Sequence, residues 1–329
     1  MTAATAHAQF IEARRAYLGA SDIAAVAGLD GAFGSPLSVY MDKVCPEQAE
    51  DRDNLPMRRG LWLERFIADE FARVTGYVAY RCKPLVRTDW GFPAGAALDF
   101  CLARRDRPRT AVAVLEAKAA LSYYARQQWK APDPIKGYTE GDLPDAYYAQ
   151  VEWQLAVAEA TLPHVRKAFA AADTGDEDLT IVPVKPNKAV QAKLVEAGRK
   201  FWTKHVLAKV PPEPNGSDRD GEILRGMWPE TIPDPPVYIE DPAAEKLLSD
   251  YLAHKFKAEE HGREADKAKQ QIQALMGEHE AAVIGGWRTS WKPQTAVRID
   301  TTRLKKERPD VAAEYAKEST SRRFNVKEV

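Results

Sequence analysis

Two acidic residues and one lysine have the types and the spacing that phosphodiester chemistry requires. Asp99 lies in the alternating segment GAALDFCLA, and Glu116 and Lys118 lie near the end of the apolar run AVAVLEAKAA. Successive side chains of a strand point to opposite faces, so Glu116 and Lys118 project the same way. The basic loop 104–109 between the two segments predicts an antiparallel hairpin that brings Asp99 and Glu116 together. The sequence thus predicts two close carboxylates with a lysine beside them.

This arrangement implies a bound cation. Two close carboxylates repel each other unless a cation joins them, and Mg²⁺ prefers oxygen ligands while it keeps several waters. One of these waters can attack a phosphodiester, and Lys118 can orient it and offset charge in the transition state. The alternative interpretation of the same residues is an ordinary ion pair between Glu116 and Lys118 at the end of a strand.

A third carboxylate, Glu64, lies in a segment that predicts a helix over residues 57–75. Glu64 shares one face of this helix with Ile67, Phe71 and Val74. A carboxylate in an apolar stripe is costly unless it is paired or bound to a metal. Glu64 therefore joins the candidate site, and the alternatives are a glutamate that reaches solvent at the helix edge or a salt-bridged core glutamate.

The composition limits the class of protein. The 329 residues are 45% hydrophobic and carry a formal net charge of −1, which argues against indiscriminate nucleic-acid binding. We expect a cytoplasmic protein without membrane contact, because we find neither a long apolar run nor the pattern of a signal peptide. Three widely spaced cysteines predict neither a disulfide framework nor a zinc site, and they are too few for a four-cysteine iron–sulfur cluster; they are Cys45, Cys82 and Cys101.

A proline-rich stretch, residues 211–242, predicts an extended connector between two parts of the chain. Residues 1–210 show mixed α/β patterns, and residues 243–329 are predicted to be mainly helical. In the first part we expect helices over 21–27, 57–75, 145–160 and 188–209, and strands over 84–88, 96–103, 111–119 and 180–184.

The second part is predicted to hold a helix over 243–276, a hairpin over 281–299 that turns at 292–295, a helix over 301–317 and a strand over 322–326. The hairpin carries basic residues interleaved with aromatic ones, which can follow a nucleic-acid strand; they are Trp287, Arg288, Trp291 and Lys292. We favour tryptophans packed on the long helix beneath a solvated basic surface, because nothing fixes these residues on one face.

Four segments, in this order, resemble the PD-(D/E)xK nuclease superfamily, and within it the YqaJ-like viral recombinases and the phage lambda exonuclease family. They are RRAYLGASDIAAVAGL, RRGLWLERFIADEFARVTG, the hairpin from Asp99 to Lys118, and PDAYYAQVEWQLAVAEA. The resemblance implies an α/β fold with a PD-(D/E)xK restriction-endonuclease-like core, in which helices flank a central mixed sheet. It also implies a mainly helical C-terminal extension.

The resemblance implies roles for the residues already singled out. Asp99 and Glu116 would bind the metal together with the main-chain carbonyl of Ala117, and Glu64 would reach the metal through a water. Lys118 matches the catalytic lysine of the family.

Three further polar residues match family positions. Gln150 matches the glutamine that positions the attacking water or the substrate, and its alternative is an ordinary polar helix edge. Arg14 and Ser21 match residues that bind a terminal 5′-phosphate, a ligand that suits a guanidinium and a hydroxyl. Their alternative is a surface arginine and an N-cap serine. The chain departs from the pattern at Leu98, where the superfamily has proline, and at Ala97, where the lambda exonuclease family has serine.

The implied activity is a Mg²⁺-dependent DNA exonuclease, with Mn²⁺ able to replace Mg²⁺. It would digest linear duplex DNA from its ends, 5′ to 3′, and leave single-stranded DNA for phage-type recombination. The implied partners are DNA ends, further copies of the chain in a ring-like oligomer, and a single-strand annealing protein. The alternatives are an endonuclease or repair nuclease on the same core, and a catalytically silent DNA-binding module.

Overall fold

The computed structural model describes residues 12–45, 55–129, 143–230, 232, 235–317 and 323–327. The chain forms two compact units, Met1–Pro229 and Glu230–Val329, each of which has its own secondary structure. The candidate site residues all belong to the first unit, which is therefore described in more detail.

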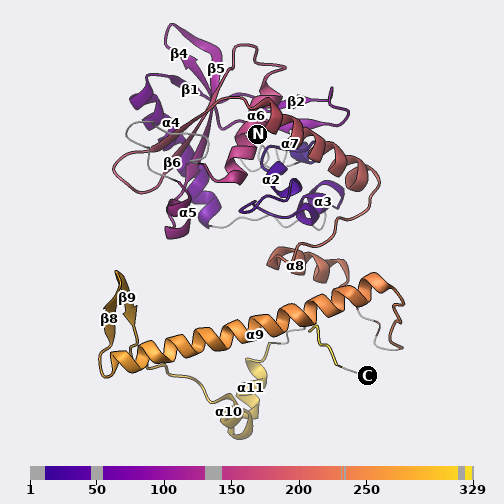
Figure 1. Ribbon diagram of the computed structural model, residues 1–329, viewed down its shortest axis with the longest axis vertical. Helices are drawn as coiled ribbons and strands as arrows, with labels where there is room; N and C mark the ends of the chain where they lie inside the picture. The colour runs from indigo at the N-terminus through magenta and orange to yellow at the C-terminus, as the bar shows by residue number, and fades with distance from the viewer. Residues whose placement is uncertain are drawn as a thin grey trace. The chain divides into compact units, whose positions relative to one another are not determined.

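The first unit is built on a five-stranded sheet (Figure 1). Strands β5 and β6 run parallel, and every other neighbouring pair is antiparallel, so the sheet is mixed as predicted. The long strand β5 is central because it pairs with β4 on one side and β6 on the other. In spatial order the strands are β1 (Val78–Tyr80), β4 (Phe100–Arg104), β5 (Arg107–Ala119), β6 (Ala168–Asp173) and β7 (Thr180–Val184).

Helices cover both faces of this sheet, which gives the α/β architecture expected from the resemblance. Helix α4 (Leu55–Thr75) packs on one face, where Ile67 and Phe71 join an apolar cluster with strand residues such as Leu115. Val74 is exposed, so it does not continue the predicted apolar face. Helices α6 (Asp145–Ala158) and α7 (Lys188–Phe201) belong to the second and larger apolar cluster. A π-helical turn, η3 (Trp202–Leu207), extends α7.

Helices α2 (Ile23–Val26) and α3 (Pro36–Val44) complete the larger cluster. Helix α3 begins at Ser35, whose hydroxyl accepts from the amide of Ser38 at 2.9 Å. The same hydroxyl donates to the buried carboxylate of Asp220 in helix α8 (Asp218–Met227). Helix α8 lies inside the predicted connector, so residues up to Pro229 are part of the first unit rather than extended linker. The many prolines of this stretch led to the prediction of a connector. The helix was missed because the buried contact that anchors it, from Ser35 to Asp220, joins residues far apart in the sequence.

The strand predicted over residues 96–103 is interrupted. Strand β3 (Ala94–Ala96) pairs with β2 (Leu85–Arg87) in a separate two-stranded sheet, and β4 begins only at Phe100. The chain bends at Asp99 between them. As a result Leu98 joins the larger apolar cluster, whereas Phe100 and Leu102 face α4, and the alternation predicted across this bend is wrong.

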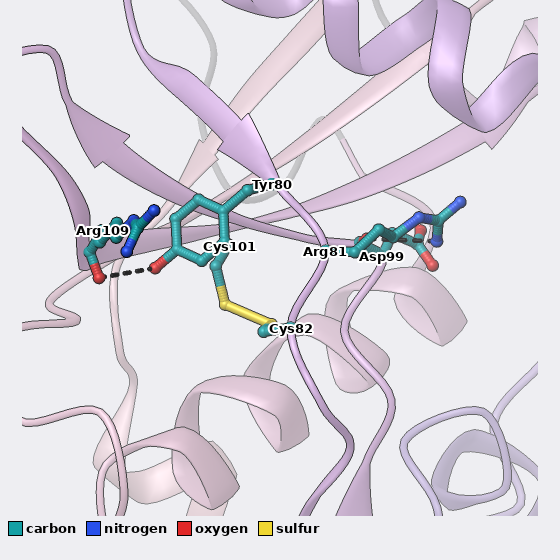
Figure 2. Close-up of a disulfide and its surroundings, with 6 residues drawn as sticks. All are labelled: Tyr80, Arg81, Cys82, Asp99, Cys101 and Arg109. Atoms are coloured by element: carbon teal, nitrogen blue, oxygen red, sulfur yellow. Dashed lines mark hydrogen bonds between the residues drawn. A yellow bond between two sulfur atoms is a disulfide. The ribbon is translucent and has the colours of Figure 1, made fainter.

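Cys82 and Cys101 form a disulfide, which corrects the expectation that the cysteines form none (Figure 2). Their Cα atoms lie 6.2 Å apart, within the range that a disulfide spans. The antiparallel register of β1 and β4 places Tyr80 opposite Cys101, so Cys82 leaves the strand end close to its partner. The spacing of the two cysteines could not reveal this, because the pairing depends on strand β1, which we did not predict.

The second unit contains helix α9 (Pro242–Met276), the hairpin of β8 (Ala281–Ile284) and β9 (Trp287–Ser290), and helices α10 (Thr301–Glu307) and α11 (Pro309–Glu314). The hairpin turns at Gly285 and Gly286, not at the predicted 292–295, because both glycines adopt the positive φ that a two-residue hairpin turn requires. Pro309 divides the helix predicted over 301–317. Residues 323–327 contain no strand, and Arg322 lies outside the described residues.

Within the described part of the chain, no helix is both long enough and apolar enough to span a lipid bilayer.

The loop that carries Arg14 and Ser21 is fixed against strand β3. The amide of Leu18 donates to the carbonyl of Pro93 at 3.0 Å, and the amide of Gly95 donates to the carbonyl of Leu18 at 2.9 Å. The buried ring of Tyr17 occupies the space where Gly95 lacks a side chain.

Gly95→Ala is therefore expected to destabilise the first unit. A Cβ at this position would lie 2.3 Å from Cδ2 of Tyr17. Overpacking of this kind lowers the free energy of unfolding by about 1–3 kcal/mol, which urea denaturation would measure. In a Tyr17→Ala background the same substitution should cost much less. An equal cost in both backgrounds would show that the ring is not the cause.

Candidate active site

Glu116 is the most enclosed acidic residue of the predicted site. It lies on the central strand β5 with only 1% of its surface exposed. Lys118 and Gln150 donate to Oε1, Gln150 from 2.6 Å, and Gln154 donates to Oε2. The two glutamines come from successive turns of α6, and Lys118 projects from the same face of β5 as Glu116. The predicted alternation along β5 therefore matches the structure.

Asp99 reaches the same strand from the bend before β4. Its Oδ2 accepts from the amide of Ala117 at 2.9 Å. The N–H and C=O of one strand residue point to the same edge, so the carbonyl of Ala117 is also directed to the side of Asp99. The predicted metal ligands Asp99, Glu116 and Ala117 therefore meet at one place, as the hairpin suggested.

Glu64 reaches the site from helix α4. Its Oε2 accepts from Nη2 of Arg81 at 2.7 Å, and Nη1 of Arg81 donates to the main-chain carbonyl of Asp99 at 3.2 Å. Glu64 thus lies next to Asp99 through a shared arginine. The structure brings together all five residues predicted to be catalytic, and their catalytic roles remain predictions.

The closeness of the carboxylates changes the pKa values of Asp99 and Lys118. Burial, with further contributions from the charges of Glu116 and Glu64, raises the pKa of Asp99 to about 8. Burial by itself would lower the pKa of Lys118, but the carboxylates of Glu116 and Asp99 raise it above its ordinary value. Lys118 therefore stays charged, whereas Asp99 keeps its proton only below about pH 8.

The donor set fits a divalent cation that is bound by few protein ligands. Among the described residues, no three His, Cys, Asp or Glu side chains lie close enough to enclose a metal ion. Mg²⁺ does not need such a cage, because it is usually held by one or two carboxylates, with waters and substrate phosphates completing its coordination. Asp99, Glu116 and the Ala117 carbonyl supply that number of oxygen ligands. Burial first, and then the neighbouring charge of Glu116, raises the pKa of Asp99, and a bound cation would oppose both effects.

The two residues predicted to bind a 5′-phosphate also lie together. Nη2 of Arg14 donates to the hydroxyl of Ser21 at 2.6 Å and lies 3.8 Å from Asp22. Lys43, whose side chain is almost fully buried, contacts Asp22 at 3.0 Å. Burial by itself would raise the pKa of Asp22, but the charges of Lys43 and Arg14 hold it below its usual value. Lys43 thus offsets the charge of Asp22, which would otherwise repel a phosphate beside Arg14.

Four residues of these two sites were not assigned roles from the sequence. Gln154 lies in the helix predicted over 145–160 and Asp22 in the helix predicted over 21–27, but neither position indicated a site residue. Arg81 and Lys43 gave no signal, because each acts on a carboxylate that is remote in the sequence.

The central strand of this mixed α/β sheet carries Glu116-Ala117-Lys118, Asp99 lies in the bend before the neighbouring strand β4, and helix α4 supplies Glu64. This arrangement is that of the PD-(D/E)xK nuclease fold. Residues 9–161 match the model of the YqaJ-like viral recombinase domain. This match confirms the resemblance to the YqaJ-like viral recombinases that the four sequence segments carry. The nucleases of this superfamily generally use divalent metals.

Individual proteins resemble the chain over greater lengths. It is 27% identical over 317 residues to the protein YqaJ of Bacillus subtilis (strain 168), an alignment that covers 96% of this chain and 92% of that protein. An alkaline exonuclease from Laribacter hongkongensis has 14% identity and a TM-score of 0.44 over 66% of this chain and 98% of its own. A phage-related exonuclease from Haemophilus somnus 129PT has 10% identity and a TM-score of 0.41, over 59% and 96%.

The raised pKa of Asp99 predicts a pH-dependent stability of the metal-free protein. Because the folded state keeps a proton that the unfolded chain releases, this contribution to stability is complete below pH 3.8 and is lost as pH rises through about 8. Asp99→Asn removes the dependence. In EDTA, the melting temperature of the variant should therefore rise relative to wild type across this range.

The control for this prediction is Asp106→Asn, in the exposed turn between β4 and β5. It should follow the wild-type curve. A difference between Asp99→Asn and wild type that does not change with pH would contradict the prediction.

Gln154 offers a second test, with Gln191 as its matched control. Each glutamine is buried and donates to a buried carboxylate, Gln154 to Glu116 and Gln191 to Glu152 at 2.8 Å. Replacing either with Met removes one donor from a buried carboxylate, so each variant should lose about 1–3 kcal/mol of unfolding free energy. Only Gln154→Met should also weaken Mg²⁺ binding, measured by calorimetry, because only Glu116 belongs to the candidate site. An equal effect of both variants on Mg²⁺ binding would contradict this assignment.

Proposed function

We propose that the protein is a Mg²⁺-dependent exonuclease that digests linear duplex DNA from its ends in the 5′ to 3′ direction. The observation that carries the proposal is the convergence of Asp99, Glu116 and Lys118 at one end of β5, with Glu64 beside them. The family of the domain is one of nucleases, which supports DNA as the substrate.

In this proposal Asp99, Glu116 and the carbonyl of Ala117 would hold the ion, Glu64 would reach it through a water, and Mn²⁺ would be able to replace Mg²⁺. The ion would supply charge compensation for the carboxylates and activation of the attacking water. Gln150 and Gln154 fix the carboxylate of Glu116 through its two oxygens, so its orientation is set before substrate arrives.

Lys118 contributes a permanent positive charge at the reacting phosphate. Its ammonium group donates to Glu116 and lies 5.1 Å from the centre of the Tyr147 ring. These contacts, together with the raised pKa, keep it charged and oriented. A preorganised cation of this kind stabilises the additional negative charge of the transition state.

The pair of Arg14 and Ser21 supports recognition of the DNA end. A guanidinium and a hydroxyl 2.6 Å apart can both donate to a terminal 5′-phosphate, and Lys43 balances the adjacent Asp22. We therefore propose that a 5′-phosphorylated strand is the preferred substrate.

The second unit is proposed to serve DNA contact or oligomerisation. Helix α9 has 35 residues and carries exposed apolar side chains along its first half, among them Leu247, Tyr251 and Phe256. A ring-like oligomer would keep the enzyme on DNA although the net charge is −1. A single-strand annealing protein is the proposed recipient of the single-stranded product, and the cytoplasm is the proposed location.

Digestion of linear duplex DNA with a 5′-phosphate on one strand tests the activity. With Mg²⁺ the phosphorylated strand should disappear first, whereas EDTA should stop the reaction and covalently closed plasmid should stay intact. Lys118→Ala should lower the rate about 10²–10³-fold, because a preorganised charge at the reacting phosphate is lost. Arg14→Gln should remove the preference for the phosphorylated strand while cleavage continues.

Other results would point to other functions. Cutting of the closed plasmid would identify an endonuclease on the same core. Absence of cleavage on every substrate, with DNA binding retained, would identify a catalytically silent binding module.

A further inference from the structure

Arg81 contacts the candidate active site although no sequence motif marks it. It lies between Tyr80, the last residue of β1, and the disulfide-bonded Cys82. Its guanidinium joins two elements of the site, because it donates to Glu64 of α4 at 2.7 Å and to the carbonyl of Asp99 at 3.2 Å. Arg81 thus contacts one carboxylate of the site, Glu64, as Lys118 contacts another, Glu116.

The surroundings of Arg81 fix one face of its guanidinium and leave the other open. The group lies 4.4 Å from the centre of the Phe100 ring, and this ring is fully buried. The Arg81 side chain nevertheless remains 55% exposed, compared with 22% for Lys118 and 16% for Glu64. A guanidinium has five N–H donors, and the two contacts with Glu64 and Asp99 use two of them. Donors therefore remain for a ligand that arrives from solvent.

The main chain that carries Arg81 is held on both sides. The hydroxyl of Tyr80 donates to the carbonyl of Arg109 at 3.4 Å, and the disulfide joins Cys82 to Cys101 of β4. Figure 2 shows Arg81 directed to Asp99, with the disulfide and Tyr80 directed elsewhere. An arginine that starts from a fixed main chain loses little conformational freedom when it binds a ligand, which favours recognition.

We propose that Arg81 binds the DNA phosphate that lies at the carboxylates, and so is a further substrate-binding residue of this site. The inference rests on the proposed nuclease function, because it takes the phosphodiester to bind beside Asp99. A phosphate next to three carboxylates needs compensating positive charge, and Arg81, which contacts Glu64, is more exposed than Lys118, which contacts Glu116. Its planar fork matches the oxygen atoms of a phosphate.

The simpler role for Arg81 is purely structural: it would only hold Glu64 in place. Arg199 provides a matched control for that role. It is 50% exposed, donates to the carboxylate of Glu196 at 2.8 Å, and donates to the carbonyl of Trp90 at 3.2 Å. Its contacts resemble those of Arg81 in kind and in exposure, but none of them involves a candidate site residue.

The test is the salt dependence of DNA binding by the full chain, in Mg²⁺ and in a Lys118→Ala background that slows cleavage. Binding of a 5′-phosphorylated duplex is measured by fluorescence anisotropy over a series of KCl concentrations. Arg81→Gln should raise Kd by about tenfold or more, and should reduce the slope of log K against log salt by about one, as expected for one lost phosphate contact. Arg199→Gln should leave Kd and slope unchanged.

Arg81→Lys keeps the positive charge but loses the fork, so it should keep the wild-type slope while Kd rises. It also keeps the proposal testable if Arg81→Gln does not fold, which thermal denaturation would reveal, because Arg81→Lys with wild-type Kd would overturn the role of the fork. An unchanged slope in folded Arg81→Gln would overturn the phosphate contact and leave Arg81 as a structural residue.

The two proposals can fail separately. If the wild-type protein cleaves DNA but folded Arg81→Gln keeps the wild-type slope, only the assignment of Arg81 fails. If the slope changes as expected but the wild-type protein cleaves no DNA, the nuclease function fails and the phosphate contact stands. Absence of DNA binding by wild-type protein would overturn both.

Discussion

The enclosed carboxylate of Glu116 is the constraint on which the site depends. Burial of an ionised carboxylate is costly unless charges and hydrogen bonds compensate it. Here the compensation comes from Lys118 on the same strand and from two glutamines of α6. Helix α6 must therefore pack against β5 with one orientation about its own axis, the one that directs both glutamines to Glu116. The contacts that position the Glu116 carboxylate also fix how the helix packs on the sheet.

The other two acidic residues of the site, Glu64 and Asp99, add negative charge that the side chains of the protein do not fully neutralise. Arg81 balances Glu64 and Lys118 balances Glu116, whereas Asp99 receives a main-chain amide and retains a raised pKa. A divalent ion would complete the charge balance, and its binding would displace the proton of Asp99. Proton release on metal binding is thus a property of the same geometry that would permit cleavage.

The candidate phosphate site is connected to the carboxylates through main-chain contacts. Leu18 bonds to Pro93 and Gly95, so the loop that carries Arg14 and Ser21 lies beside the strand that leads into Asp99. The absence of a side chain at Gly95 permits this approach, since the ring of Tyr17 fills the space. End recognition and cleavage, if both proposals hold, would share one rigid part of the fold.

The sequence by itself predicted the candidate residues that the structure brings together at the carboxylates, and the segments that carry them. Alternation along β5 and the helical face of α4 place Glu116, Lys118 and Glu64 by local geometry, because strand and helix periods act over a few residues. Tertiary structure decided the rest: the bend at Asp99, the disulfide, helix α8 packed against α3, and the partners of Arg81. Each depends on segments that are remote in the sequence and meet only when the sheet assembles. A short strand such as β1 also has too few residues to show a recognisable alternation of apolar and polar side chains.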